Sequence, residues 1–140
     1  MKIFRVLSVL FFTLLVLKPV FASESLVVVT DGWTRISNTK TSASYMTIKN
    51  IQDKDVILVS ASSDFASIVE LHKTVTENNI SQMVPINRLV IPAHDEVLLK
   101  PKGLHIMLIG LKKPLVKGEV VPISLHFENM GPVTVNTIVK

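Results

Sequence analysis

One strand-like stretch of the chain, residues 103–109, reads Gly-Leu-His-Ile-Met-Leu-Ile. Successive side chains of a β-strand point to opposite faces, so the leucines and the first isoleucine of this stretch would share one face. His105 and Met107 would then share the other face. An imidazole nitrogen and a thioether sulfur held on one stiff element suit a soft metal ion, and Cu(I) accepts both donors. We therefore expect a core strand that also carries two metal ligands.

Runs of aliphatic and β-branched residues continue on both sides of this stretch, separated by Gly, Pro, Asn and Asp. Such punctuation is typical of an all-β sandwich or barrel. No window of a dozen residues keeps an apolar helical period free of Pro or Gly, so no helix is predicted. The expected strands are residues 26–29, 33–37, 43–50, 56–60, 66–72, 88–91, 97–99, 104–109, 120–127 and 133–139.

The first 22 residues have the pattern of a secretion signal. Lys2 and Arg5 give a basic start, and an uncharged run of 12 residues follows at 6–17. That run is too short to span a bilayer comfortably, although an uncleaved anchor is the alternative. The segment ends in Val-Phe-Ala at 20–22, so we expect cleavage after Ala22.

Cleavage would change the charge balance. The chain has 15 Lys and Arg against 11 Asp and Glu, and the first 22 residues hold three of the basic residues and no acid. Residues 23–140 are therefore almost neutral, which gives no support to nucleic-acid binding. Their length suits one domain with its own core. We expect no membrane span in the mature chain.

The chain contains no cysteine. Blue-copper electron transfer requires a Cys thiolate, and thiol catalysis requires a thiol, so both functions are excluded. Methionine is the soft ligand that remains. The absence of disulfides does not argue against export for a domain of this size.

Four histidines and four methionines follow residue 22. We interpret Met46 as a core residue, Met130 as incidental in a turn, and His94 and His126 as surface residues. The others have an informative spacing, His-x10-Met-x21-His-x-Met, and are His72, Met83, His105 and Met107. No strand is predicted between residues 72 and 88, and a loop at 77–79 would let Met83 fold over a bound metal.

This spacing resembles the signature of the periplasmic copper chaperones of the PCuAC type. The surrounding segments resemble blocks of the same family: Asp-Gly-Trp-Thr-Arg at 31–35, residues 43–50, Val-Glu-Leu-His at 69–72 and residues 101–108. The family is often rich in methionine between its first His and Met ligands, whereas residues 73–82 here contain none. The resemblance therefore covers most of the chain after residue 22 with one departure.

The resemblance implies a cupredoxin-like Greek-key β fold for residues 23–140. It implies a periplasmic, non-enzymatic carrier of one Cu(I). The copper would go toward the binuclear copper centre of cytochrome c oxidase or to another copper carrier. The ligands implied are His72, Met83, His105 and Met107.

Three alternatives stay open. The first is a periplasmic copper store or resistance protein with the same ligands. The second is a zinc enzyme built on His72 and His105, which needs a third nitrogen or oxygen ligand and has only Glu70 within the ligand spacing. The third is an assembly module of immunoglobulin type, in which the four soft donors would have no role.

Overall fold

The computed structural model describes residues 26–140, so the predicted signal peptide at 1–22 lies outside the described part. Within that part the chain forms ten β-strands and no helix. No helix of residues 26–140 is therefore long and apolar enough to cross a membrane. The strands are β1 Val27–Thr34, β2 Thr41–Asn50, β3 Val56–Ser62, β4 Ala66–Glu77, β5 Ile80–Pro85, β6 Leu89–Ile91, β7 Glu96–Leu99, β8 His105–Leu111, β9 Val120–Phe127 and β10 Val133–Val139.

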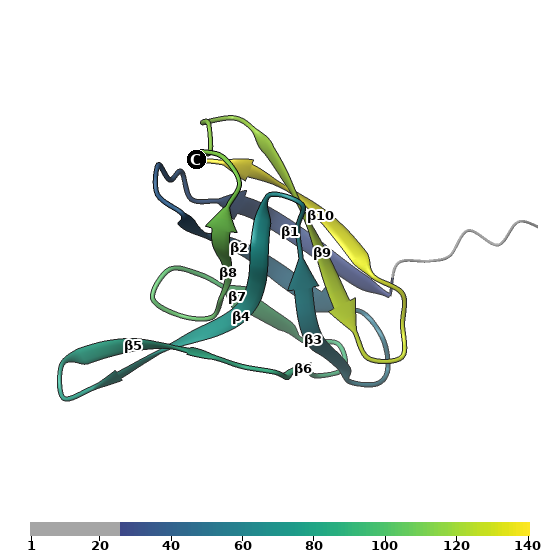
Figure 1. The fold of residues 1–140 in the computed structure, drawn as a ribbon. Coiled ribbons are helices and arrows are strands. Elements are labelled where there is room, and N and C mark those ends of the chain that lie inside the picture. The colour runs from purple at the N-terminus through teal and green to yellow at the C-terminus, as the bar shows by residue number, and fades with distance from the viewer. Residues whose placement is uncertain (1–25) are drawn as a thin grey trace, which may run out of the picture.

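The ten strands form one continuous sheet that curls around a core (Figure 1). Their order is β5-β4-β8-β2-β1-β10-β9-β3-β6, and β7 pairs with β2 beside this path. The first and last strands of the described chain, β1 and β10, form a parallel pair, whereas all other pairs are antiparallel. Strand β4 thus lies between the exposed hairpin partner β5 and the core strand β8.

Strand β8 supplies the centre of the core, as its alternating sequence predicts. Ile106 and Leu108 have no solvent exposure, and Met46 of the neighbouring β2 is 2% exposed. Full burial of one such side chain stabilises the fold by roughly 1.5–3 kcal/mol. The prediction of a core face on β8 is confirmed, and so is the core role of Met46.

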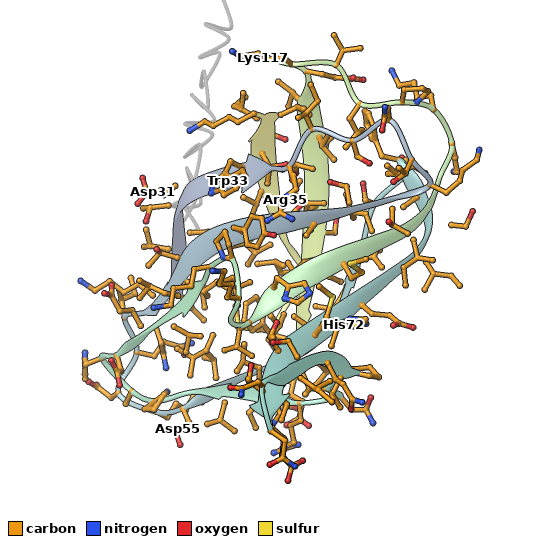
Figure 2. All side chains as sticks on the ribbon, turned by 90° about the vertical axis from the view of Figure 1, so that its left-hand side faces the viewer. Asp31, Trp33, Arg35, Asp55, His72 and Lys117 are labelled. Atoms are coloured by element: carbon orange, nitrogen blue, oxygen red, sulfur yellow. The ribbon has the colours of Figure 1, made fainter. Side chains whose placement is uncertain are left out.

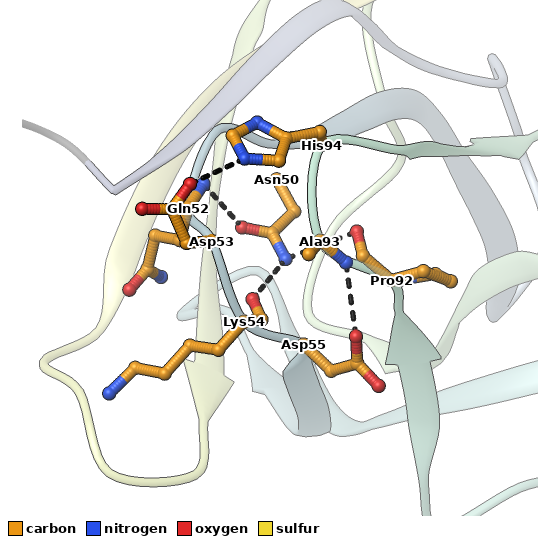
Figure 3. A network of polar contacts seen from close by, with 8 residues as sticks. All are labelled: Asn50, Gln52, Asp53, Lys54, Asp55, Pro92, Ala93 and His94. Carbon is orange, nitrogen blue, oxygen red and sulfur yellow. Dashed lines mark hydrogen bonds and ion pairs between the residues drawn. The ribbon is translucent and has the colours of Figure 1, made fainter.

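A buried amide joins two turns at one end of the sheet (Figure 3). The Nδ2 of Asn50 donates to the carbonyl oxygens of Lys54 at 2.8 Å and Ile91 at 3.0 Å, and its Oδ1 accepts the Gln52 backbone N–H at 3.0 Å. The side chain has no solvent exposure. It satisfies backbone groups of both turns that would otherwise be buried without partners.

No strand is expected from the sequence between residues 72 and 88, but the structure has one on each side of the predicted loop at 77–79. Strand β4 continues to Glu77, and β5 pairs with it from Ile80 to Pro85. The turn between them consists of Asn78 and Asn79, which both have positive φ angles, 51° and 62°. Two such residues form the type I′ turn that fits the twist of a two-residue hairpin, and asparagine tolerates this conformation.

The expected separate strands at 26–29 and 33–37 are also one element. Strand β1 runs from Val27 to Thr34, and its register against β2 shifts between Thr30 and Trp33. Asp31 has a φ of 56° within this irregularity. The Asp-Gly pair therefore forms a bulge inside a strand and does not reverse the chain.

Candidate metal centre

The pairing of β4 with β8 brings two of the predicted ligands together. His72 lies directly opposite His105. Directly opposite residues of an antiparallel pair point to the same face, so both imidazoles leave the sheet on one side. Their ring centroids are 5.7 Å apart, with an angle of 63° between the planes. The next pair along these two strands, Leu71 and Ile106, points into the core on the other face.

Each imidazole uses one ring nitrogen in a hydrogen bond within the protein. The Nε2 of His72 lies 2.7 Å from an Oε2 oxygen of Glu70, and the Nδ1 of His105 lies 2.9 Å from the Gly103 carbonyl oxygen. An ionised carboxylate and a carbonyl can only accept, so both nitrogens carry the proton and donate it. The remaining ring nitrogen of each histidine is therefore a lone-pair donor.

Those two lone-pair nitrogens have no hydrogen-bond partner. In residues 26–140, the Nδ1 of His72 and the Nε2 of His105 are the only buried side-chain nitrogen or oxygen atoms of this kind. His72 is 9% exposed and His105 is 3% exposed. An unpaired buried polar atom costs about 1–3 kcal/mol, so a folded chain rarely keeps one without a role. Metal-binding histidines are held in this way, with the second nitrogen donating to a carboxylate or a backbone carbonyl.

The two predicted methionine ligands lie on the same face of the sheet. Met107 is two residues after His105 on β8 and lies opposite Glu70. Met83 is on β5 and lies opposite Thr74 of β4, which is two residues after His72. Because alternate residues of a strand share a face, the register places Met83 on the side of the histidines. Coordination of a metal by these four residues stays a prediction.

The ligands differ strongly in burial. Both histidines are buried and Met107 is half-buried, whereas Met83 is 58% exposed. Every residue of β5 is exposed. The candidate centre is therefore closed on the side of β8 and open on the side of β5.

Aromatic side chains border the centre beyond His105. Figure 2 labels Trp33, Arg35 and His72 among the side chains of this region. The ring of Tyr45 is 6.4 Å from that of His105, and the ring of Trp33 is 4.5 Å from that of Tyr45. The Arg35 guanidinium lies 5.6 Å from the centre of the Tyr45 ring. Burial raises the pKa of the Tyr45 hydroxyl, and the positive charge of Arg35 opposes that rise. Trp33 is thus separated from His105 by one ring.

The other histidines lie elsewhere and have partners. The Nε2 of His94 lies 2.7 Å from a carboxylate oxygen of Asp53, and the Nε2 of His126 lies 2.9 Å from the Ser62 hydroxyl. The described chain contains no cluster of three or more His, Cys, Asp or Glu side chains that could hold a metal ion. The side chains with sulfur on the face of the His72–His105 pair are Met83 and Met107.

Sequence reasoning missed the role of the groups that hold the imidazoles. The sequence suggests Glu70 only as a third zinc ligand and gives no indication of the Gly103 carbonyl. A signal was present for the first, because residues 70 and 72 of one strand share a face. The backbone carbonyl has no sequence signal.

Comparison with protein families gives a match over residues 27–139 to the family described as "Putative lipoprotein LpqE-like". Two curated relatives are the "Putative lipoprotein Lxx21020" of Leifsonia xyli subsp. xyli, 36% identical over 102 residues, and the "Uncharacterized protein RP573" of Rickettsia prowazekii, 32% identical over 103 residues. The matches cover 72% and 73% of this chain, but only 61% and 55% of the two relatives.

Solved structures share the fold. The copper-bound PCuAC domain of PmoF2 superposes with a TM-score of 0.69 at 21% identity, over 83% of this chain and 93% of that domain. The solution structure of Cu(I)-DR1885 from Deinococcus radiodurans gives a TM-score of 0.60 at 33% identity, over 80% of this chain and 78% of that one. These likenesses confirm the predicted all-β, cupredoxin-like fold class. By its sequence, the chain belongs to the LpqE-like family.

Proposed function

We propose that this protein is an exported Cu(I) chaperone that binds one Cu(I) through His72, Met83, His105 and Met107. The observation that carries the proposal is the pair of buried, unpartnered nitrogens, Nδ1 of His72 and Nε2 of His105. A buried lone pair that is shielded from water and accepts no hydrogen bond is well suited to bind a cation. The 33% identical DR1885, whose structure was solved with Cu(I), supports copper as that cation.

The donor types support the monovalent ion. Imidazole nitrogen and thioether sulfur are neutral ligands, and thioethers favour Cu(I) over harder cations. The nearest carboxylate, Glu70, is already bonded to His72 and leaves the pair of nitrogens free. A zinc enzyme would require a third nitrogen or oxygen ligand and a bound water, for which no cluster is present among residues 26–140.

The remaining parts of the proposal concern location and destination. A signal peptide at 1–22, cleaved after Ala22, would deliver residues 23–140 to the periplasm as a copper-binding domain. There the protein carries copper and catalyses no reaction. The recipient is the copper-site subunit of cytochrome c oxidase or another copper carrier. An oxidase that keeps its copper content in a strain without this protein would contradict the first recipient.

An anaerobic competition titration of residues 23–140 against a Cu(I)-specific chelator tests the proposal. We expect one tightly bound Cu(I) per chain, weak Zn(II) binding, and lower Cu(I) affinity in Met107→Ala and Met83→Leu. Met130→Leu is the matched control, because Met130 lies in a turn outside the centre, and it should bind as the wild type does. Absence of Cu(I) binding would refute the proposal. Strong Zn(II) binding that is unchanged in Met107→Ala and Met83→Leu would also refute it.

A further inference from the structure

We propose that Glu70 is a positioning residue that makes Nδ1, and not Nε2, the metal-binding nitrogen of His72. This inference rests on the proposed function and extends it. Glu70 binds no metal itself in this scheme. It acts by accepting the Nε2 proton of His72 in a 2.7 Å hydrogen bond.

The two histidines are held in opposite tautomers. The Glu70 carboxylate fixes the proton of His72 on Nε2, while the Gly103 carbonyl fixes the proton of His105 on Nδ1. His72 therefore presents Nδ1 and His105 presents Nε2. These are the two buried nitrogens without partners. The donor atoms left by the two hydrogen bonds are thus also the two nitrogens that are buried.

Glu70 can reach His72 because the two residues are close together on the same strand. Glu70 and His72 are alternate residues of β4, so their side chains leave the strand on the same face. Leu71 between them is 3% exposed and anchors this part of the strand in the core. The His72 side chain is 11% exposed and that of Glu70 is 42% exposed. The bond therefore lies at the rim of the centre, and its carboxylate side is much more exposed to solvent than its imidazole side.

Loss of the carboxylate would free the His72 ring. The imidazole could then move its proton to Nδ1 or rotate, and the lone pair would no longer be fixed at Nδ1. Removal of such outer partners commonly costs 10–100-fold in metal affinity. Glutamine at position 70 keeps an acceptor oxygen and removes the negative charge. If the charge of Glu70 mattered, Glu70→Gln would therefore weaken Cu(I) binding as much as Glu70→Ala does.

The test compares Glu70→Ala and Glu70→Gln with Glu77→Ala, a matched control on the same strand. Two-bond ¹H–¹⁵N correlations of the imidazoles in the copper-free protein report which nitrogen of each histidine is protonated. Competition with a Cu(I) chelator reports affinity, and circular dichroism verifies the fold. These readouts separate positioning from a general loss of structure.

We expect the wild type, Glu70→Gln and Glu77→Ala to show His72 protonated at Nε2 and to bind Cu(I) alike. Glu70→Ala should lose the fixed tautomer of His72, keep that of His105, and bind Cu(I) about 10–100-fold more weakly. Wild-type tautomer and affinity in Glu70→Ala would overturn the inference, as would equal weakening in Glu70→Ala and Glu70→Gln. A wild-type chain that binds no Cu(I) would overturn the proposed function first, and this inference with it.

Discussion

Replacement of His105 by Phe should stabilise the copper-free protein. His105 is 3% exposed, and its Nε2 is buried without a partner. Phenylalanine keeps a planar ring that is one atom larger, and it has no polar atom at this position. A buried, unpaired polar atom costs the folded state about 1–3 kcal/mol, so its removal returns an energy of that size.

The substitution also removes one hydrogen bond, from Nδ1 of His105 to the Gly103 carbonyl. A bond of this type contributes about 0.5–1.5 kcal/mol. The Gly103 oxygen keeps a second donor, the backbone N–H of Thr74 at 3.3 Å, and is not left unpaired. The net gain is thus about 1 kcal/mol, which corresponds to a rise in Tm of about 4 °C for a domain of this length.

Copper should reverse the order of the two melting temperatures, so that the wild type becomes more stable than His105→Phe. A ligand that binds only the folded state at 100 times its Kd stabilises it by about 2.7 kcal/mol, which exceeds the gain from the substitution. Thermal unfolding followed by circular dichroism, with and without Cu(I), measures both effects. We expect the variant to melt above the wild type without copper, and the wild type to melt above the variant with it.

A matched substitution, His126→Phe, separates this effect from the general benefit of an aromatic ring in a strand. The Nε2 of His126 is already bonded to Ser62, so this change should give no comparable gain. The reasoning fails if His105→Phe lowers or leaves unchanged the Tm of the copper-free protein. It also fails if His126→Phe stabilises the protein as much.

Three further predictions concern other parts of the molecule. Asn50→Ala should lower the free energy of unfolding by about 2–4 kcal/mol in urea titrations, because several buried backbone groups lose their partner; a loss below 1 kcal/mol would contradict this. The Lys113 hydrogen bond holds the pKa of Glu119 below its ordinary value, so this contribution to stability is present above about pH 4.5 and is lost as the pH falls. In acid titrations the free energy of unfolding of Glu119→Gln should fall less steeply with pH than that of the wild type. Equal slopes for the two proteins would refute this prediction. Trp33 is the only tryptophan and packs on Tyr45, so Cu(I) should alter its emission in the wild type but not in His105→Ala.

The core strand was predictable from sequence, whereas the hairpin beside it was not. Ile106 and Leu108 alternate with the less apolar His105 and Met107, and that contrast identifies both the strand and its buried face. Strand β5 has no buried residue, so its side chains carry no alternation between core and solvent. Its one signal was the pair Asn78-Asn79, which can form a two-residue turn but is weaker than Asn-Gly.

The spacing of the candidate ligands could be read from the sequence, but their geometry could not. That His72 lies opposite His105 depends on the register between β4 and β8, which are separated along the chain by β5, β6 and β7. A shift of one residue would send one imidazole to the core face. The choice of ring nitrogen depends on Glu70 and a backbone carbonyl, and neither is encoded in the motif.

The unequal burial of the four proposed ligands bears on how a carrier can release a tightly held ion. The imidazoles are fixed by hydrogen bonds on β4 and β8, whereas Met83 lies on the β4–β5 hairpin, which extends away from the rest of the sheet (Figure 1). Its flexible thioether is 58% exposed. A partner that approaches from β5 meets this sulfur before either nitrogen. If the four residues bind copper as proposed, Met83 would be the ligand that an incoming donor reaches first, and the two buried imidazole nitrogens would be reached last.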